Sequence, residues 1–291
     1  MEQPLLLSGK EVSKQVYKNL QEKIIDLKNR NIIPGLAVVL VGENPASKIY
    51  VRSKTKIFNK LELKAKTFHL DVETSEVELV NLISKLNNDV SYHGILVQLP
   101  LPKHINSSTI INSIDPEKDV DGFHPENAGL LSIGKPRFIP CTPKGIMRIL
   151  EYYNISLNGK HVVVLGRSNI VGRPISILTS LKSKFSNATT TICHSGTKDI
   201  EKYTKNADVI IAALGIPEFL KKNMVKNRSV IIDVGINRID ADNQKGYNIV
   251  GDTKFDDLKE SVSAITPVPG GVGPMTIAML VENTIEASEI L

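Results

Sequence analysis

The sequence predicts an α/β fold of two domains, and three observations support it. Short apolar runs alternate with segments of helical periodicity along most of the chain, a pattern typical of parallel sheets covered by helices. A β-branched run at 162–164 ends in a glycine-containing turn, which leads into another helical segment. The length of 291 residues is ordinary for about two domains.

The first part of the chain alternates helices and strands. Capping-box pairs, in which a serine precedes a glutamate by three residues, open two of the helices. The predicted elements are a helix from Ser8 to Leu27, strands at 36–41, 64–70 and 94–99, and helices at 46–61 and from Ser75.

The segment 115–142 is rich in Pro, Gly and Asp and predicts a domain boundary. Thr142 and Pro143 predict the N-cap and first residue of a helix. Further strands are predicted at 161–165, 189–193, 209–213 and 230–234, a second linker at 267–274, and a final helix at 275–291.

The final helix is expected to return to the first domain. The expected division is therefore 1–141 with 274–291 as one domain and 142–273 as the other.

Composition argues against several classes of protein. The net charge of +5 comes from 36 basic and 31 acidic residues that are dispersed, which suits small anionic ligands rather than duplex nucleic acid. Cys141 and Cys193 lie too far apart for a zinc or disulfide pattern. No apolar run approaches membrane-spanning length and no signal segment is recognised, so we expect a cytoplasmic protein.

The turn after the strand 161–165 predicts a nucleotide site. Its spacing, G-R-S-x-x-x-G, lets backbone N–H groups approach a phosphate, although an ordinary buried strand with a tight turn fits the pattern too. Arg167 can bind a phosphate with two hydrogen bonds, which favours NADP over NAD. Ser195 follows the next strand, where the adenosine ribose is read in such folds.

Lys54 is the candidate proton carrier. On the helix 46–61 it shares a face with Tyr50 and lies two turns after Ser47. A lysine on an interior face loses hydration, which lowers its pKa toward neutrality. The alternative is a lysine at the edge of the stripe that extends its ammonium to water.

Two polar residues near strand ends could act with Lys54. Gln98 offers a neutral amide that hydrogen-bonds an ammonium without fixing its charge, or it caps its own loop. Asp121, in the segment DVDG, could accept two N–H donors from a heterocycle. It could equally be a turn residue.

Two later loops complete the candidate site. The segment 233–237 ends a strand beside the expected nicotinamide position. Three glycines in the loop 269–276 allow close approach to a flat ligand, and a mobile hinge is the simpler alternative.

The motifs SKIYVRSK, VQLPLP, DVDGFHPEN, PCTP, GRSNIVGRP, DVGINR and PGGVGPMT occur in this order. Together they closely resemble the bifunctional methylenetetrahydrofolate dehydrogenase/methenyltetrahydrofolate cyclohydrolase family, the FolD proteins, over essentially the whole chain. The resemblance implies an N-terminal α/β catalytic domain that binds folate, a Rossmann-like NADP-binding domain, a cleft between them and a homodimer.

The resemblance also implies the reaction. Hydride passes from 5,10-methylenetetrahydrofolate to NADP⁺, and water then opens the methenyl product to 10-formyltetrahydrofolate, as part of one-carbon metabolism and purine biosynthesis. Lys54 matches the family's catalytic lysine, Tyr50 the tyrosine that packs on folate, Gln98 the glutamine that tunes the lysine, and Asp121 the aspartate that anchors the pterin.

By the same resemblance, the other substrate-binding positions are Ser47, Leu99, Pro269, Gly270, Gly273 and Thr276, and the cofactor-binding positions are Gly166, Arg167, Ser168, Ser195 and Ile236. No metal is expected.

Two departures from the family and three rival functions remain. Gly196 replaces a basic residue found in many relatives, and the segment 179–187 is longer than usual, which lengthens a helix or a surface loop. The rivals are a shikimate-type dehydrogenase, a non-catalytic nucleotide sensor and a nucleic-acid binder.

Overall fold

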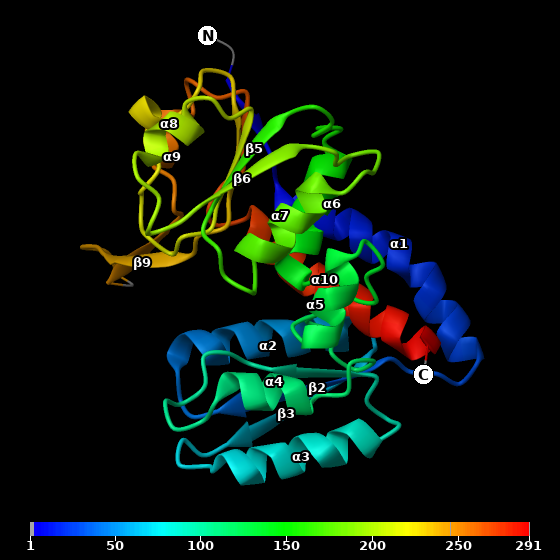
Figure 1. The fold of residues 1–291 in the computed structure, drawn as a ribbon. Helices are drawn as coiled ribbons and strands as arrows, with labels where there is room; N and C mark the ends of the chain where they lie inside the picture. The colour runs from blue at the N-terminus through cyan, green and yellow to red at the C-terminus, as the bar shows by residue number, and fades with distance from the viewer. Residues whose placement is uncertain (1–2, 245, 291) are drawn as a thin grey trace. The chain divides into compact units, whose positions relative to one another are not determined.

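The structure, a computed structural model, describes residues 3–244 and 246–290. It divides into two compact units. We call residues 1–15 with 142–276 the large-sheet unit, and residues 16–141 with 277–291 the small-sheet unit. Figure 1 shows the course of the chain through both.

The division differs from the expected domains at the N-terminus. Residues 1–15 belong to the large-sheet unit rather than to the first domain. The physical reason is backbone pairing: β1 (Leu5–Leu6) runs parallel to β11 (Ala264–Ile265), and the Lys10 N–H donates to the Gly270 carbonyl at 3.2 Å. A two-residue strand has no periodicity for the sequence to show.

The small-sheet unit is built on three parallel strands in the order β3-β2-β4. They are β2 (Gly35–Val41), β3 (Lys64–Leu70) and β4 (Gly94–Val97), close to the predicted ranges. All seven residues of the central strand β2 are buried, because helices cover both of its faces. The chain turns to opposite sides of β2, which creates a ligand position at the carboxyl ends of β2 and β4.

Helices cover the two faces of the small sheet (Figure 1). Residues of α3 (Glu76–Asn88) and α4 (Ser107–Ser113) form one core cluster with alternate residues of β2, and α2 (Pro45–Lys60) lies on the other face. The unit also contains α5 (Pro125–Ser132), most of α1 (Gly9–Asn29) and most of α10 (Val272–Ile290).

One predicted capping box is confirmed, and in the other only one of the two reciprocal hydrogen bonds forms. Ser75 and Glu78 make both reciprocal hydrogen bonds at the start of α3. At the start of α1 the Glu11 N–H donates to the Ser8 hydroxyl at 3.4 Å. The Ser8 N–H instead donates to the Tyr153 hydroxyl, which donates to the Glu11 carboxylate. A tertiary contact has replaced the local bond.

The large-sheet unit contains six parallel strands in the order β1-β11-β8-β7-β5-β6. The chain passes from β5 to β6 on one side and then to β7 on the other, so the strand order reverses at β5. The remaining strands of the sheet are β5 (His161–Leu165), β6 (Thr189–Cys193), β7 (Val209–Ala212) and β8 (Val230–Asp233).

The other elements of this unit are short. They are α6 (Cys141–Tyr152), α7 (Gly172–Ser180), α8 (Ile200–Thr204), α9 (Phe255–Leu258), a 3₁₀ turn at Lys222–Met224, and the hairpin β9 (Asn237–Asp240) and β10 (Tyr247–Val250). Because α7 ends at Ser180, the long segment 179–187 is mainly a loop rather than an extended helix.

Two boundary predictions are wrong and one is confirmed. Helix α6 begins at Cys141, so Thr142 is not its N-cap. The segment 115–142 contains α5, and the division between the two units falls at its end, between Cys141 and Thr142, as predicted. The second linker is shorter than 267–274, because α10 already begins at Val272.

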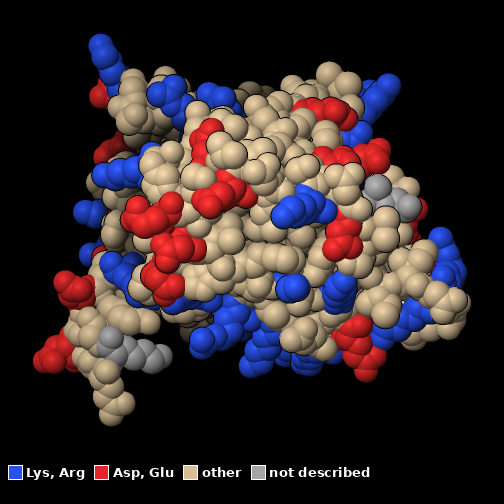
Figure 2. Space-filling model, turned by 90° about the horizontal axis from the view of Figure 1, so that it is seen from below, with Lys and Arg blue, Asp and Glu red and all other residues tan. Residues whose placement is uncertain are grey.

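Basic and acidic side chains are intermixed over the face in Figure 2, with several basic ones along its lower edge. This agrees with the dispersed charge of the sequence. Among the described residues, no helix is both long and apolar enough to cross a membrane.

Candidate functional site

Helix α2 places Lys54 in the interior of the small-sheet unit. Asn44 caps the helix, since its side-chain oxygen accepts from the Ser47 N–H at 3.1 Å. The face of α2 that turns inward consists of Ser47, Val51, Lys54 and Phe58. Lys54 is only 7% exposed, so it does not extend its ammonium to bulk water. Burial lowers the pKa of Lys54, while Asp121 and Cys141 act in the opposite direction.

Gln98 meets Lys54 directly after β4. The Lys54 ammonium donates to Gln98 Oε1 at 3.0 Å, and Gln98 Nε2 donates to the Leu99 carbonyl at 2.7 Å. The side chain therefore both caps its own loop and contacts the lysine. Because the acceptor is a neutral amide, it does not hold Lys54 in the charged form as a carboxylate would.

Asp121 is the third member of this group. Burial raises the pKa of its carboxyl group, while Lys54 and a hydrogen bond with the Cys141 thiol act in the opposite direction. Asp121 also precedes a tight turn, in which Gly122 has φ +71°. The turn is therefore confirmed, and the role of the carboxyl group toward a heterocycle stays a prediction. The Cys141 thiol was not predicted as a member of this group, although its position in the PCTP motif was an available signal.

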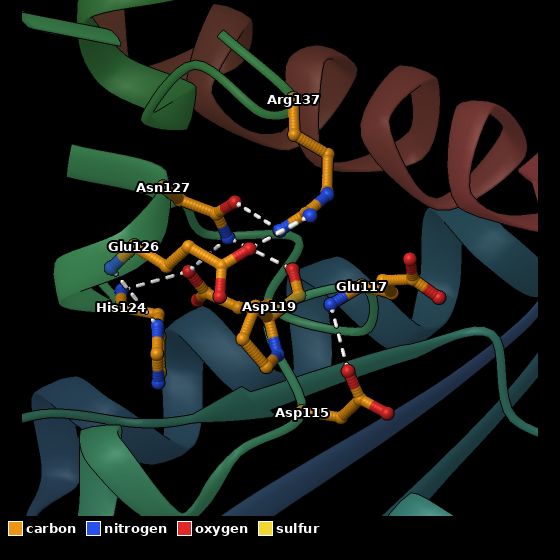
Figure 3. Close-up of polar contacts among 8 residues, drawn as sticks. Asp115, Glu117, Asp119, His124, Glu126, Asn127 and Arg137 are labelled. Atoms are coloured by element: carbon orange, nitrogen blue, oxygen red, sulfur yellow. Dashed lines mark hydrogen bonds and ion pairs between the residues drawn. The ribbon is translucent and has the colours of Figure 1, made fainter. Parts of the chain in front are cut away.

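A buried polar network holds the loop that carries Asp121 (Figure 3). The Asp119 carboxylate, 1% exposed, accepts from the His124 N–H at 2.8 Å and from Asn127 Nδ2 at 2.9 Å. Asn127 Oδ1 in turn accepts from Arg137 at 3.1 Å, and Arg137 pairs with Glu126 at 2.8 Å. Burial raises the pKa of Asp119 to about 7, against these hydrogen bonds.

The remaining predicted residues of this unit lie on the same elements. Tyr50 is half-buried one turn before Lys54, and burial raises the pKa of its phenol. Ser47 is 5% exposed, and Leu99 follows Gln98 and is half-buried. The small-sheet unit therefore brings a lysine, an amide, a carboxyl group and a thiol together.

The large-sheet unit provides the predicted phosphate turn between β5 and α7. Gly166 has φ +113°, and a Cβ there would lie 2.2 Å from the Ala213 carbonyl oxygen, so only glycine fits. The Ser168 hydroxyl accepts from the N–H groups of Val171 and Gly172 at 3.1 and 3.3 Å, which shapes the turn. The side chain of Arg167 is exposed.

Arg167 and Ser195 each lie two residues after the carboxyl end of a strand, Arg167 after β5 and Ser195 after the neighbouring strand β6. Strands β5 and β6 pair Leu165 with Cys193, and each candidate residue follows its strand by two positions. Both side chains are exposed, and Arg167 has no ion-pair partner within the described part of the chain. An open arginine and a hydroxyl beside a glycine turn fit the phosphorylated ribose of NADP.

A pocket of about 210 Å³ lies beside the end of β8. Ile236, Pro269, Gly270 and Gly273 all line it, together with Lys10, which sequence analysis missed. Gly270 has φ +109°, a conformation that suits glycine. Thr276 is not among the lining residues; its hydroxyl lies 3.0 Å from that of Thr142.

Two buried aspartates, also missed from the sequence, fix the loops around this pocket. Asp233 accepts from the N–H groups of Gly235, Asp252 and Thr253 at 2.9 Å each. Asp252 accepts from the N–H groups of Leu214 and Gly215. These hydrogen bonds tie together the backbone at residues 214–215, 235 and 252–253. Burial raises the pKa of Asp233 to about 6.

A family model described as tetrahydrofolate dehydrogenase/cyclohydrolase, catalytic domain, matches residues 7–121, and one described as the NAD(P)-binding domain of the same family matches residues 140–290. The chain belongs to the tetrahydrofolate dehydrogenase/cyclohydrolase family.

Individual members of the family match over their full length. The bifunctional protein FolD of Chloroherpeton thalassium is 50% identical over 289 residues, 98% of each chain. The crystal structure of the bifunctional enzyme FolD from Campylobacter jejuni is 48% identical, with a TM-score of 0.92 over 98% of each chain. The Trypanosoma brucei FolD structure, complexed with NADP and an inhibitor, is 34% identical, with a TM-score of 0.94 over 100% of this chain and 99% of that one.

Proposed function

We propose that this protein is a bifunctional one-carbon folate enzyme. It oxidises 5,10-methylenetetrahydrofolate to 5,10-methenyltetrahydrofolate with NADP⁺ and then hydrolyses the product to 10-formyltetrahydrofolate. The observation that carries the proposal is the buried Lys54 ammonium, hydrogen-bonded at 3.0 Å to the neutral amide of Gln98 and electrostatically coupled to Asp121. Membership of the tetrahydrofolate dehydrogenase/cyclohydrolase family supports both activities.

The large-sheet unit holds the cofactor in this proposal. Gly166 and Ser168 form the turn that receives the pyrophosphate, and Arg167 with Ser195 binds the phosphorylated ribose. Ile236 packs beside the nicotinamide. When bound, NADP⁺ accepts the hydride. Gly196 adds no charge, so NADP preference depends on Arg167 and Ser195.

The small-sheet unit holds the folate. Asp121 accepts hydrogen bonds from the amino-pyrimidine edge of the pterin. Tyr50 supplies a flat surface on which the ring system packs. The remaining contacts on this unit are assigned to Ser47, Gln98 and Leu99. The family resemblance also assigns contacts to Pro269, Gly270, Gly273 and Thr276, which belong to the large-sheet unit.

Lys54 manages the proton in the hydrolysis step. Water adds to the methenyl carbon and its proton passes toward Lys54, whose lowered pKa makes the neutral amine accessible. The C–N5 bond then opens as the added hydroxyl group becomes a carbonyl and its proton passes to N5, and the one-carbon unit remains on N10 as a formyl group. Gln98 keeps the side chain of Lys54 in place both when the amine gains the proton and when the ammonium loses it.

A two-stage assay tests the proposal. The protein is mixed with 5,10-methylenetetrahydrofolate and NADP⁺, and the absorbance of NADPH and of the methenyl product is followed. We expect both to rise and the methenyl signal then to decay. Absence of both products would exclude the folate assignment. Turnover of shikimate with NADP⁺ would support the shikimate-type rival, and binding without any turnover would support a sensor.

We further propose that the enzyme is a cytoplasmic homodimer that serves purine biosynthesis. The dimer and the pathway rest on the family resemblance. The two cysteines are buried and unbonded to each other, as expected in a reducing compartment. Sedimentation at several protein concentrations tests the dimer; a single monomeric species at micromolar concentration would contradict it.

A further inference from the structure

Asn283 on α10 lies in the core of the small-sheet unit, and its side chain is fully buried. Its Nδ2 donates to the Val120 carbonyl at 2.8 Å and to the Ile139 carbonyl at 3.0 Å. Val120 directly precedes Asp121, and Ile139 lies two residues before Cys141. One amide thus connects the two segments that carry the partners of Lys54.

The same amide approaches the thiol itself. Asn283 Nδ2 lies 3.8 Å from Cys141 Sγ, and the thiol donates to the Val120 carbonyl at 3.5 Å. The Val120 carbonyl therefore accepts from both Asn283 and Cys141. The position of Asp121 along the loop depends on this shared acceptor.

The neighbouring polar residues of α10 behave differently. Thr284 and Ser288 are also buried, but their hydroxyls donate to the carbonyls of Leu280 and Ile285 within the helix. Burying an amide without partners is costly, so an apolar residue would serve better if Asn283 only filled space. Its hydrogen bonds leave the helix and reach the loop of Asp121.

The loop is held on its other side by different contacts. The Ile95 N–H donates to the Lys118 carbonyl at 2.8 Å, and the Asp119 network anchors the following turn (Figure 3). These contacts fix residues 118 and 119 to the sheet and to α5. Asn283 fixes the backbone at residue 120, next to Asp121, whose carboxyl group interacts electrostatically with Lys54.

We propose that Asn283 is a positioning residue, which sets the place of Asp121 and Cys141 relative to Lys54 and thereby the affinity for folate. This rests on the proposed function, in which Asp121 binds the pterin. Asn283 acts through these two segments, because its own side chain is fully buried.

The test uses Asn283→Leu, which keeps the side-chain volume and removes both donors. We expect KM for methylenetetrahydrofolate to rise about 10-fold or more, while KM for NADP⁺ stays within about twofold. Because Asp121 raises the pKa of Lys54, a displaced carboxyl group also shifts the pH profile of the cyclohydrolase reaction to lower pH.

Thr284→Val is the matched control, because it removes a buried hydroxyl that bonds only within α10. It should leave both KM values and the pH profile unchanged. If the leucine variant does not fold, Asn283→Ser keeps one donor and should show the same shifts at a smaller size. An unchanged folate KM and pH profile in a folded Asn283 variant would overturn the inference, whereas an inactive wild-type protein would instead overturn the proposed function.

Discussion

The Lys54 ammonium donates to Gln98 Oε1 at 3.0 Å, and this hydrogen bond joins helix α2 to the end of strand β4. Gln98 cannot readily turn its amide around, because its Nε2 donates to the Leu99 carbonyl at 2.7 Å. The lysine therefore always faces an oxygen acceptor that carries no net charge. The hydrogen bond to Gln98 therefore keeps the Lys54 side chain in place without preventing the ammonium from losing its proton.

Replacing Lys54 with methionine should abolish the cyclohydrolase reaction. The variant keeps the length of the buried side chain but cannot accept a proton, so the rate of methenyl decay should fall about 10²-fold or more. Oxidation depends mainly on alignment of substrate and cofactor, and NADPH formation should persist.

Lys56→Met is the control for this variant, since Lys56 lies on α2 and is exposed. It should retain both rates. A Lys54→Met protein that hydrolyses the methenyl compound at the wild-type rate would remove Lys54 from the mechanism.

Gln98→Glu should move the pH dependence of the cyclohydrolase reaction upward. A carboxylate at this distance favours the charged ammonium, so it raises the pKa of Lys54, and the neutral amine then forms only at higher pH. The pH–rate profile of methenyl decay should shift by about one unit or more to the alkaline side. A shift to lower pH would show that Gln98 does not act through the charge of Lys54.

Arg167→Ala should weaken NADP⁺ binding selectively. The guanidinium is exposed at the end of β5 and is assigned to the ribose phosphate, so its loss should raise KM for NADP⁺ about 10-fold or more. KM for NAD⁺, which lacks that phosphate, should change little and serves as the internal control. Equal losses for both cofactors would place Arg167 elsewhere on the nucleotide.

Asp119→Asn should reduce the pH dependence of stability. The folded-state pKa of Asp119 is raised to about 7, above the unfolded value, so the folded form binds the proton more tightly. This contribution is fully present below the unfolded pKa and is lost as the pH rises through about 7. Between pH 5 and pH 8 the wild-type free energy of unfolding should lose about 3 kcal/mol through this group.

Urea denaturation of the protein at pH 5, 6, 7 and 8 measures this loss, and the asparagine variant should show a flatter dependence. Asp71→Asn, an exposed aspartate of the same unit, should follow the wild-type curve. Parallel curves for Asp119→Asn and the wild type would mean that Asp119 does not titrate in this range.

Much of the fold was predictable because the parallel strands are long enough to show their pattern. The strands 64–70, 161–165 and 189–193 match the predictions residue for residue. The strands β1 and β11 could not be predicted, since two residues pair only because the rest of the sheet is in place. The sequence therefore offered no reason to group the N-terminal residues with the large-sheet unit.

Helical periodicity likewise predicted that Lys54 faces inward, but not what it meets there. Whether the lysine reached water or an interior partner depended on β4, which lies about 40 positions further along the sequence. Asn283 gave no local signal, and Cys141 gave only its place in the PCTP motif, because their contacts depend on segments that only the packed core brings together.

The sequence by itself determined the strand and helix alternation, the glycine turn at 166 and the residue types available for proton transfer and phosphate binding, because these follow from local periodicity and backbone sterics. Only the tertiary structure decided that Lys54 is buried, that its partner is a neutral amide and that Asn283 fixes the loop of Asp121. Burial and pairing are properties of side chains from distant segments, and they set the pKa values on which the chemistry depends.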